Sequence, residues 1–150
     1  DQVLFLDAAG EASLSSVLIN QGSSVNCGTV SSITLDRTRF NCEHIGTQMV
    51  ELTATDPSTN SQSCTAMVTI RDTLAPLSLC QDTVVYLDAN GLAEIDYLFV
   101  DNGSSDNCGL IKDYRLSVQT FDCSNLGTNS VTLTVADLFL IHISEPTILY

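Results

Sequence analysis

Six cysteines are the side chains of this 150-residue chain whose spacing points most clearly to chemistry. Four of them form two sets with equal spacing, because Cys42 follows Cys27 at the same distance as Cys123 follows Cys108. Disulfides stabilise small domains whose hydrophobic cores are marginal, and they persist in oxidising compartments. We therefore predict the disulfides Cys27–Cys42 and Cys108–Cys123 and an extracellular or cell-surface location.

Zinc binding is the alternative use of these cysteines, because Glu43 and His44 directly follow Cys42. Structural zinc sites are built from closely spaced ligand pairs such as Cys-x-x-Cys. The chain contains no such pair, and Asn125 stands where a second copy of the site would need a histidine. The spacing therefore favours disulfides over zinc.

An acidic loop is the candidate metal site. Its sequence D-N-G-S-S-D-N-C-G contains Asp101, Asn102 and Asp106, with Asp113 shortly after it and Asp72 on the connection before it. Calcium takes six to eight oxygen ligands, which carboxylates and amides supply. The same residue types also build tight turns without any ion. The hypothesis is a calcium site at Asp101, Asn102, Asp106 and Asp72, and the sequence indicates no other cofactor.

No residue pattern typical of an enzyme is found. His44 is the only histidine before the last thirteen residues, and no Gly-x-Ser-x-Gly motif accompanies it. The net charge of −13 opposes binding to nucleic acid or to an anionic membrane, both of which need a cationic surface. No apolar run reaches the length of a membrane span. We expect a non-catalytic protein without nucleic-acid partners and without direct membrane insertion.

The loop Asp101–Gly109 has a near copy at Asn20–Gly28, which reads N-Q-G-S-S-V-N-C-G and lies 81 residues earlier. With this offset, 22 of the 56 positions in residues 1–56 are identical to those in residues 82–137. An internal repeat indicates two copies of one small module. We expect a first module at 1–73, a linker at 74–79 that contains Pro76, and a second module at 80–137.

Alternation of apolar and polar residues predicts strands in both modules. About seven short strands per module, separated by turns and without helical periodicity, are typical of an immunoglobulin-like β-sandwich. The fold prediction is therefore all-β, with two such sandwiches in tandem. The expected strands are Val3–Leu6, Ala12–Leu18, Val30–Leu35, Gln48–Thr55 and Cys64–Ile70 in the first copy, and Val84–Leu87, Ala93–Phe99, Ile111–Val118 and Asn129–Ala136 in the second.

The repeat stops at Asp137. The segment Leu140–Thr147, L-I-H-I-S-E-P-T, resembles the translated read-through of a transposase sequencing adapter. We therefore expect residues 138–150 to be a non-native tail and the second module to lack its native last strand. A divergent but genuine terminus is the alternative, and the apolar start of the tail could occupy the place of the missing strand.

Two cysteines have no counterpart at the repeat offset. Glu145 stands where Cys64 would recur, and the counterpart of Cys80 would precede residue 1. In a complete module the first cysteine would pair with the last and connect the opening and closing strands. We expect Cys64 and Cys80 to be left unpaired by truncation, or to pair with each other across the linker.

The repeated pattern runs C-x-D-x-x-V-x-L-D-A-x-G, D-N-G-S-S-D-x-C-G, F-x-C-x-x-x-G-T-x-x-V-x-L-T-x-x-D and C-T-A-x-V-T-I-x-D-x-x-A-P. It resembles the HYR-like repeats of Bacteroidota secreted and surface proteins, which include gliding-type adhesins, and the resemblance covers residues 1–137. It implies a stalk or adhesive array whose partners are neighbouring repeats, and surface glycans or proteins. The alternative function is a carbohydrate- or protein-binding accessory module of a secreted enzyme.

Overall fold

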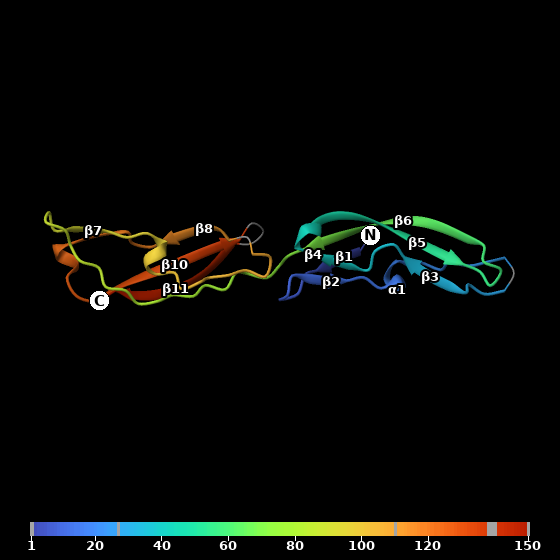
Figure 1. Cartoon of the computed structure of the whole chain (residues 1–150), viewed down its shortest axis with the longest axis horizontal. Helices are drawn as coiled ribbons and strands as arrows, with labels where there is room; N and C mark the ends of the chain where they lie inside the picture. The colour runs from blue at the N-terminus through green and yellow to red at the C-terminus, as the bar shows by residue number, and fades with distance from the viewer. Residues whose placement is uncertain (1, 27, 110, 138–140, 150) are drawn as a thin grey trace. The chain divides into compact units, whose positions relative to one another are not determined.

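The chain divides into two units, residues 1–73 and residues 74–150 (Figure 1). A computed structural model describes residues 2–26, 28–109, 111–137 and 141–149, the last of these without side chains. The described residues form short and medium β-strands with a few single helical turns, so the fold is all-β. None of these helical turns is long and apolar enough to cross a membrane.

Unit 1 contains a larger sheet with the strand order β1-β6-β5-β3 and a smaller sheet that pairs β2 with β4. The helical turns α1 (Ser16–Ile19) and η1 (Cys42–His44) lie between strands. The strands are β1 (Gln2–Phe5), β2 (Glu11–Ser13), β3 (Ser32–Leu35), β4 (Arg39–Asn41), β5 (Gly46–Thr55) and β6 (Ser61–Arg71).

Unit 2 contains a larger sheet with the strand order β11-β10-β8 and a smaller sheet that pairs β7 with β9. Its helical turns are η2 (Tyr97–Phe99) and η3 (Cys123–Asn125). The strands are β7 (Leu92–Glu94), β8 (Ile111–Leu116), β9 (Thr120–Asp122), β10 (Asn129–Asp137) and β11 (Ile141–Leu149).

The strand pairs of the two units share one register. Ala12 lies opposite Phe40 in unit 1, and Ala93 lies opposite Phe121 in unit 2, which is the same pair 81 residues later. The other shared pairings behave in the same way, with the cross-strand partners Leu35–Leu52, Leu116–Leu133, Leu52–Cys64 and Leu133–Glu145. The sequence repeat is therefore a repeat of strand pairing.

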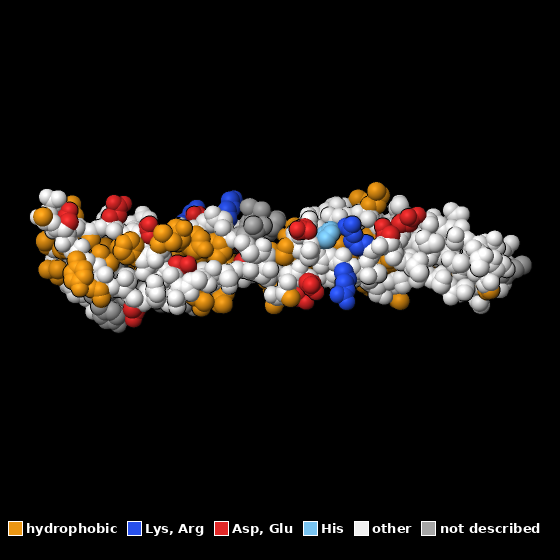
Figure 2. Space-filling view, viewed as in Figure 1, with side chains coloured by type: hydrophobic (Ala, Val, Ile, Leu, Met, Phe, Trp, Pro, Cys, Tyr) orange, Lys and Arg blue, Asp and Glu red, His pale blue; other side chains and the backbone are white. Residues whose placement is uncertain are grey.

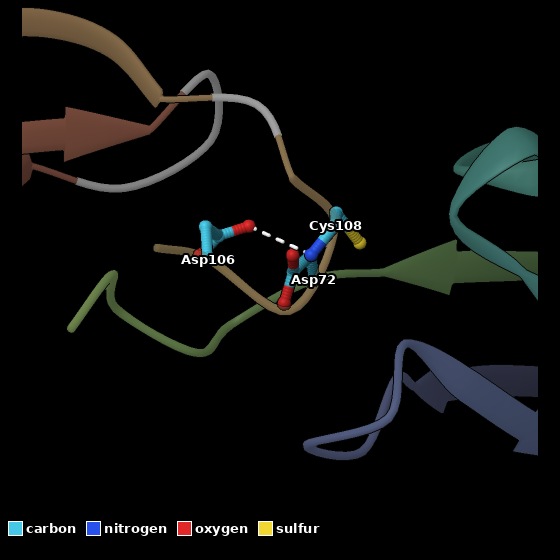
Figure 3. Close-up of side chains that lie close together, drawn as sticks. All are labelled: Asp72, Asp106 and Cys108. Atoms are coloured by element: carbon cyan, nitrogen blue, oxygen red, sulfur yellow. Dashed lines mark hydrogen bonds between the residues drawn. The ribbon is translucent and has the colours of Figure 1, made fainter. Parts of the chain in front are cut away.

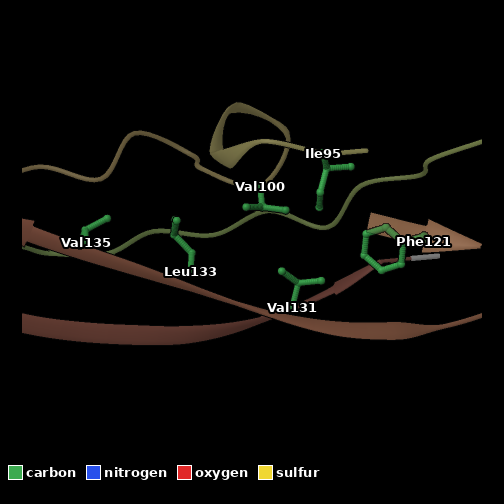
Figure 4. Close-up of a cluster of buried hydrophobic side chains, with 6 residues drawn as sticks. All are labelled: Ile95, Val100, Phe121, Val131, Leu133 and Val135. Carbon is green, nitrogen blue, oxygen red and sulfur yellow. The ribbon is translucent and has the colours of Figure 1, made fainter. Parts of the chain in front are cut away.

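The core of unit 2 lies between its two sheets (Figure 4). Phe121 comes from the smaller sheet, Val131 and Leu133 come from β10 of the larger sheet, and these side chains pack in one cluster. Tyr97 and Tyr114 stack with a ring-centroid distance of 4.2 Å and pack against the same cluster. Apolar side chains at the repeat-equivalent positions Leu14, Phe40, Val50 and Leu52 are buried in unit 1.

The predicted second strand of each module is wrong over most of its length. In unit 1 it ends at Ser13, and the helical turn α1 follows because the Ser15 side chain accepts a hydrogen bond from the Val17 N–H at 3.3 Å. In unit 2 the Asp96 carboxylate accepts from the Leu98 N–H at 2.9 Å and starts η2. Ser and Asp are favoured caps of helical turns, and this signal was outweighed by the apolar alternation.

The tail contributes the edge strand of the larger sheet in unit 2. β11 pairs antiparallel with β10, with Glu145 opposite Leu133, which is the register in which β6 pairs with β5. The place predicted to be empty in the second module is therefore filled, because an edge of β10 left open would leave backbone donors and acceptors without partners.

The predicted strand Val84–Leu87 is not formed. Its counterpart β1 pairs parallel with β6, from Gln2 opposite Val68 to Phe5 opposite Arg71. β11 ends at Leu149, the counterpart of Val68, so the positions that would pair with residues 84–86 lie beyond this strand.

Candidate functional site

The acidic loop of unit 2 is held by its own carboxylates. Asp101 accepts hydrogen bonds from the backbone N–H groups of Ser104 and Gly103, at 3.1 and 3.4 Å. Asp106 accepts from the backbone N–H of Cys108 at 2.8 Å, the bond drawn as a dashed line in Figure 3. These contacts fold the loop into consecutive turns in which the carboxylates replace main-chain acceptors.

The structure does not assemble the four predicted calcium ligands. Among the described residues, Asp101 belongs to no cluster of three or more His, Cys, Asp or Glu side chains. Asp113 pairs instead with Arg115. Asp72 is drawn in Figure 3 as well, but it belongs to unit 1, where it follows β6 with 6% of its surface exposed. Calcium binding at this loop stays a prediction.

The corresponding loop of unit 1 makes the same turn without a carboxylate. The side-chain oxygen of Asn20, the counterpart of Asp101, accepts from the N–H groups of Gly22 at 3.2 Å and Ser23 at 2.8 Å. An amide oxygen and a carboxylate oxygen serve this turn equally well. The shared function of the loop is therefore a specific backbone shape, which holds the Asn-Cys-Gly cysteine.

The second cysteine of each repeat begins a helical turn. Cys42 opens η1, capped by Asn41, and Cys123 opens η3, capped by Asp122. The Cys42 sulfur lies 3.7 Å from the carbonyl oxygen of Gly10, and the Cys123 thiol lies 3.9 Å from that of Gly91. In unit 2 the Ser124 hydroxyl donates to Asp122 and lowers the pKa of that carboxyl below its ordinary value.

The oxidation states of the cysteines differ from the prediction. Cys42 and Cys108 are each disulfide-bonded, whereas Cys64 and Cys123 are exposed free thiols. Cys80 is half-buried and keeps its thiol. The predicted disulfide Cys108–Cys123 is therefore wrong. Cys27 lies outside the described residues, so the disulfide Cys27–Cys42 stays a prediction.

The reason is that the two cysteines of unit 2 lie at opposite ends of β10. Cys108 is three residues before Ile111, which pairs with Asp137 at the end of the strand. η3 lies at the start of β10, where the Asn129 amide donates to the carbonyl of Asn125 at 2.6 Å. A nine-residue strand spans about 27 Å, whereas the Cα atoms of a disulfide lie within about 7 Å.

The zinc alternative is also wrong at Cys42. A sulfur atom in a disulfide is not a thiolate and cannot bind the metal as one. His44 is engaged elsewhere, because its Nδ1 accepts a hydrogen bond from the Asn41 N–H at 3.1 Å and its ring meets Phe40 edge-on. His44 and Asn41 together cap η1.

An apolar groove in unit 2 was not predicted from the sequence. It has a volume of about 290 Å³ and lies between the segment Val84–Leu87 and the turn that follows Cys123. Its rim includes Tyr86 and Leu126, which are 86% and 76% exposed. The sequence gave no signal for it, because the interpretation of Val84–Leu87 as a strand placed these residues in a sheet.

No protein-family model matches the chain. No curated protein matches it at a significant level either. The strand register and the state of the cysteines are therefore the observations on which a function can be argued.

Proposed function

We propose that the chain is a pair of immunoglobulin-like β-sandwich repeats that act as a structural element, a stalk or adhesive array, in a secreted or cell-surface protein. The repeat of strand register between the units supports tandem copies of one module. The core between a larger and a smaller sheet in unit 2 supports a sandwich. The resemblance to HYR-like repeats supports the surface location.

The parallel pairing of β1 with β6 carries the mechanical part of this proposal. When the first and last strands of a module run in the same direction, the chain enters at one end and leaves at the other. Successive modules of this kind extend a protein and do not fold it back on itself. Tensile load then acts along β1 and β6, so their hydrogen bonds must break together and not one after another.

The side chains support a structural role over a catalytic one. The loop carboxylates that we examined accept backbone N–H bonds, as Asp101 and Asp106 do, and so define turns. The acidic surface keeps a long array soluble. Disulfides at Cys42 and Cys108 fit an oxidising, extracellular environment. Neighbouring repeats, glycans and surface proteins are the proposed partners.

Single-molecule force spectroscopy under reducing conditions tests this function. We expect two unfolding events, each releasing about 250 Å of chain, since a unit of 73 residues extends by about 3.3–3.6 Å per residue. Unit 1 should be the stronger, because only there does the first strand pair with the last. Leu4→Pro, which removes a donor from β1, should weaken the stronger event alone. Extension without any force peak would contradict a load-bearing role.

A further inference from the structure

We propose that Cys123 is a covalent attachment point, which forms a disulfide with the Asn-Cys-Gly loop cysteine of another repeat unit. The inference rests on the proposed function as a tandem array and names the chemistry that links its members. In a preparation of this protein the other unit is supplied by a second copy of the chain.

The first argument is the difference between Cys123 and its repeat counterpart. Cys42 and Cys123 take the same position at the start of η1 and η3, next to the carbonyl groups of Gly10 and Gly91. Cys42 is half-buried and disulfide-bonded, whereas Cys123 is exposed and free. Unit 1 therefore shows that a cysteine in this setting forms a disulfide.

The second argument identifies the type of partner. Cys64, Cys80 and Cys123 all keep their thiols, so they are not bonded to Cys42. The remaining cysteines, at positions 27 and 108, both stand in Asn-Cys-Gly loops. The partner of Cys42 is therefore a cysteine of this loop type, and the same type is expected to bind Cys123.

The third argument is geometric. In unit 2 the Asn-Cys-Gly loop lies at the Asp137 end of β10, and η3 lies at the Asn129 end. The unit cannot close a disulfide between its own two ends, because about 27 Å of strand separates them. A bond between these cysteine types must therefore join the η3 end of one unit to the loop end of another.

The surface around Cys123 is suited to contact with a protein. The apolar groove lies beside it, and Val84, Tyr86 and Leu126 on its rim are 55%, 86% and 76% exposed. Ile45, the counterpart of Leu126, is only half-buried and not exposed in unit 1. Figure 2 shows apolar side chains gathered on the visible face of unit 2. A second unit docked here would cover them and hold its loop near the thiol.

The bond can form through a small-molecule disulfide such as oxidised glutathione. The Cys123 thiolate attacks one glutathione sulfur, forms a mixed disulfide and releases one glutathione thiol. The loop thiolate of the second unit then attacks the Cys123 sulfur and releases the second glutathione. Two protein thiols lose two protons and two electrons, and one glutathione disulfide is reduced to two thiols.

The test is to incubate the full chain in a glutathione redox buffer and to separate the products by non-reducing electrophoresis. We expect covalent oligomers that disappear on reduction. Cys123→Ser should abolish them. Cys64→Ser is the matched control, because it removes the other exposed free thiol and should leave the oligomers intact. Peptide mapping should connect Cys123 to an Asn-Cys-Gly peptide.

Three outcomes would overturn the proposal: monomers only, oligomers that require Cys64, or a map that joins Cys123 to Cys64, Cys80 or another Cys123. A circular dichroism spectrum of Cys123→Ser that matches the parent would show that the variant is folded. None of these outcomes would affect the force measurement, which is made under reducing conditions. Failure of the covalent link is therefore distinguishable from failure of the structural function.

Discussion

Units 1 and 2 have the same strand register but differ where the first strand meets the last. In unit 1, β1 pairs with the final residues of β6. In unit 2, β11 ends at the counterpart of Val68, residues 84–87 form no strand, and an apolar groove opens beside them. Val3–Phe5 and Val84–Tyr86 are similar in sequence. The comparison teaches that the first strand forms only when the last strand is long enough to pair with it.

The largest expected effect concerns the strand that closes unit 2. Truncation after Asp137 removes β11 and leaves one edge of β10 unpaired along its length. We expect unit 2 to unfold and unit 1 to keep its stability, because a domain of this size has only roughly 5–15 kcal/mol to lose. Hydrogen-exchange mass spectrometry would resolve the units. Unchanged protection of β10 after truncation would show that β11 contributes nothing to the fold.

Two matched core substitutions sharpen the comparison. Phe40 and Phe121 are repeat counterparts with 2% and 7% of their surface exposed. Replacing either by alanine should cost about 3–5 kcal/mol of unfolding free energy, and only in the unit that carries it. Urea denaturation followed by hydrogen exchange would assign the loss. A loss shared by both units would contradict their independence.

Two glycines separate backbone strain from steric contact in unit 2. Gly91 and Gly103 have φ values of 76° and 87°, and an added Cβ would lie 2.9 Å from the Cys123 sulfur at Gly91 but in open space at Gly103. Alanine should cost roughly 1–2 kcal/mol at Gly103 from strain alone, and more at Gly91. The excess at Gly91 should vanish in a Cys123→Ala background. Equal losses in thermal denaturation would disprove the contact.

The smallest effect is an acid sensitivity that is stronger in unit 2. The Ser124 hydroxyl lowers the pKa of Asp122, and the backbone N–H of Leu92 lowers the pKa of Asp88. A lowered folded-state pKa stabilises the unit above the unfolded value of about 4, and this contribution is lost as the pH falls through the folded value. Asp122→Asn, which installs the residue that caps η1 in unit 1, should make the loss in unit 2 shallower.

Urea midpoints between pH 6 and pH 2 would measure this effect in steps of about one pH unit, a range that brackets the carboxylate titration. Ser124→Ala is the companion variant, because it removes the main donor and keeps the carboxylate. It should also make the acid loss shallower. Unit 1 is the internal control, and a parallel change in both units would contradict the assignment to Asp122.

Much of the fold could be predicted from the sequence, because local patterns determine it. The alternation of Val50, Leu52 and Ala54 with polar residues placed β5 correctly, and the offset of 81 residues predicted equal registers. The caps at Ser15 and Asp96 were also visible as residue types, but the apolar alternation around them was given more weight. These elements depend on neighbours in sequence.

The candidate site could be predicted only in part, because it depends on distances between remote segments. Fifteen residues between Cys108 and Cys123 suggest a small closed loop, yet β8 and β9 lie between them and carry the chain along the whole unit. The groove beside Val84 depends on where β11 ends, more than fifty residues later. Spacing in sequence alone does not give these distances.

Residue-resolved amide exchange of the intact chain tests the central claim most directly. One shared register predicts matching protection at positions 81 residues apart, as at Val50 and Val131 or Leu52 and Leu133. It also predicts protection along Gln2–Phe5 and rapid exchange along Val84–Leu87, where no strand is formed. Protection patterns offset by any number other than 81, or equal protection of these two segments, would contradict the account.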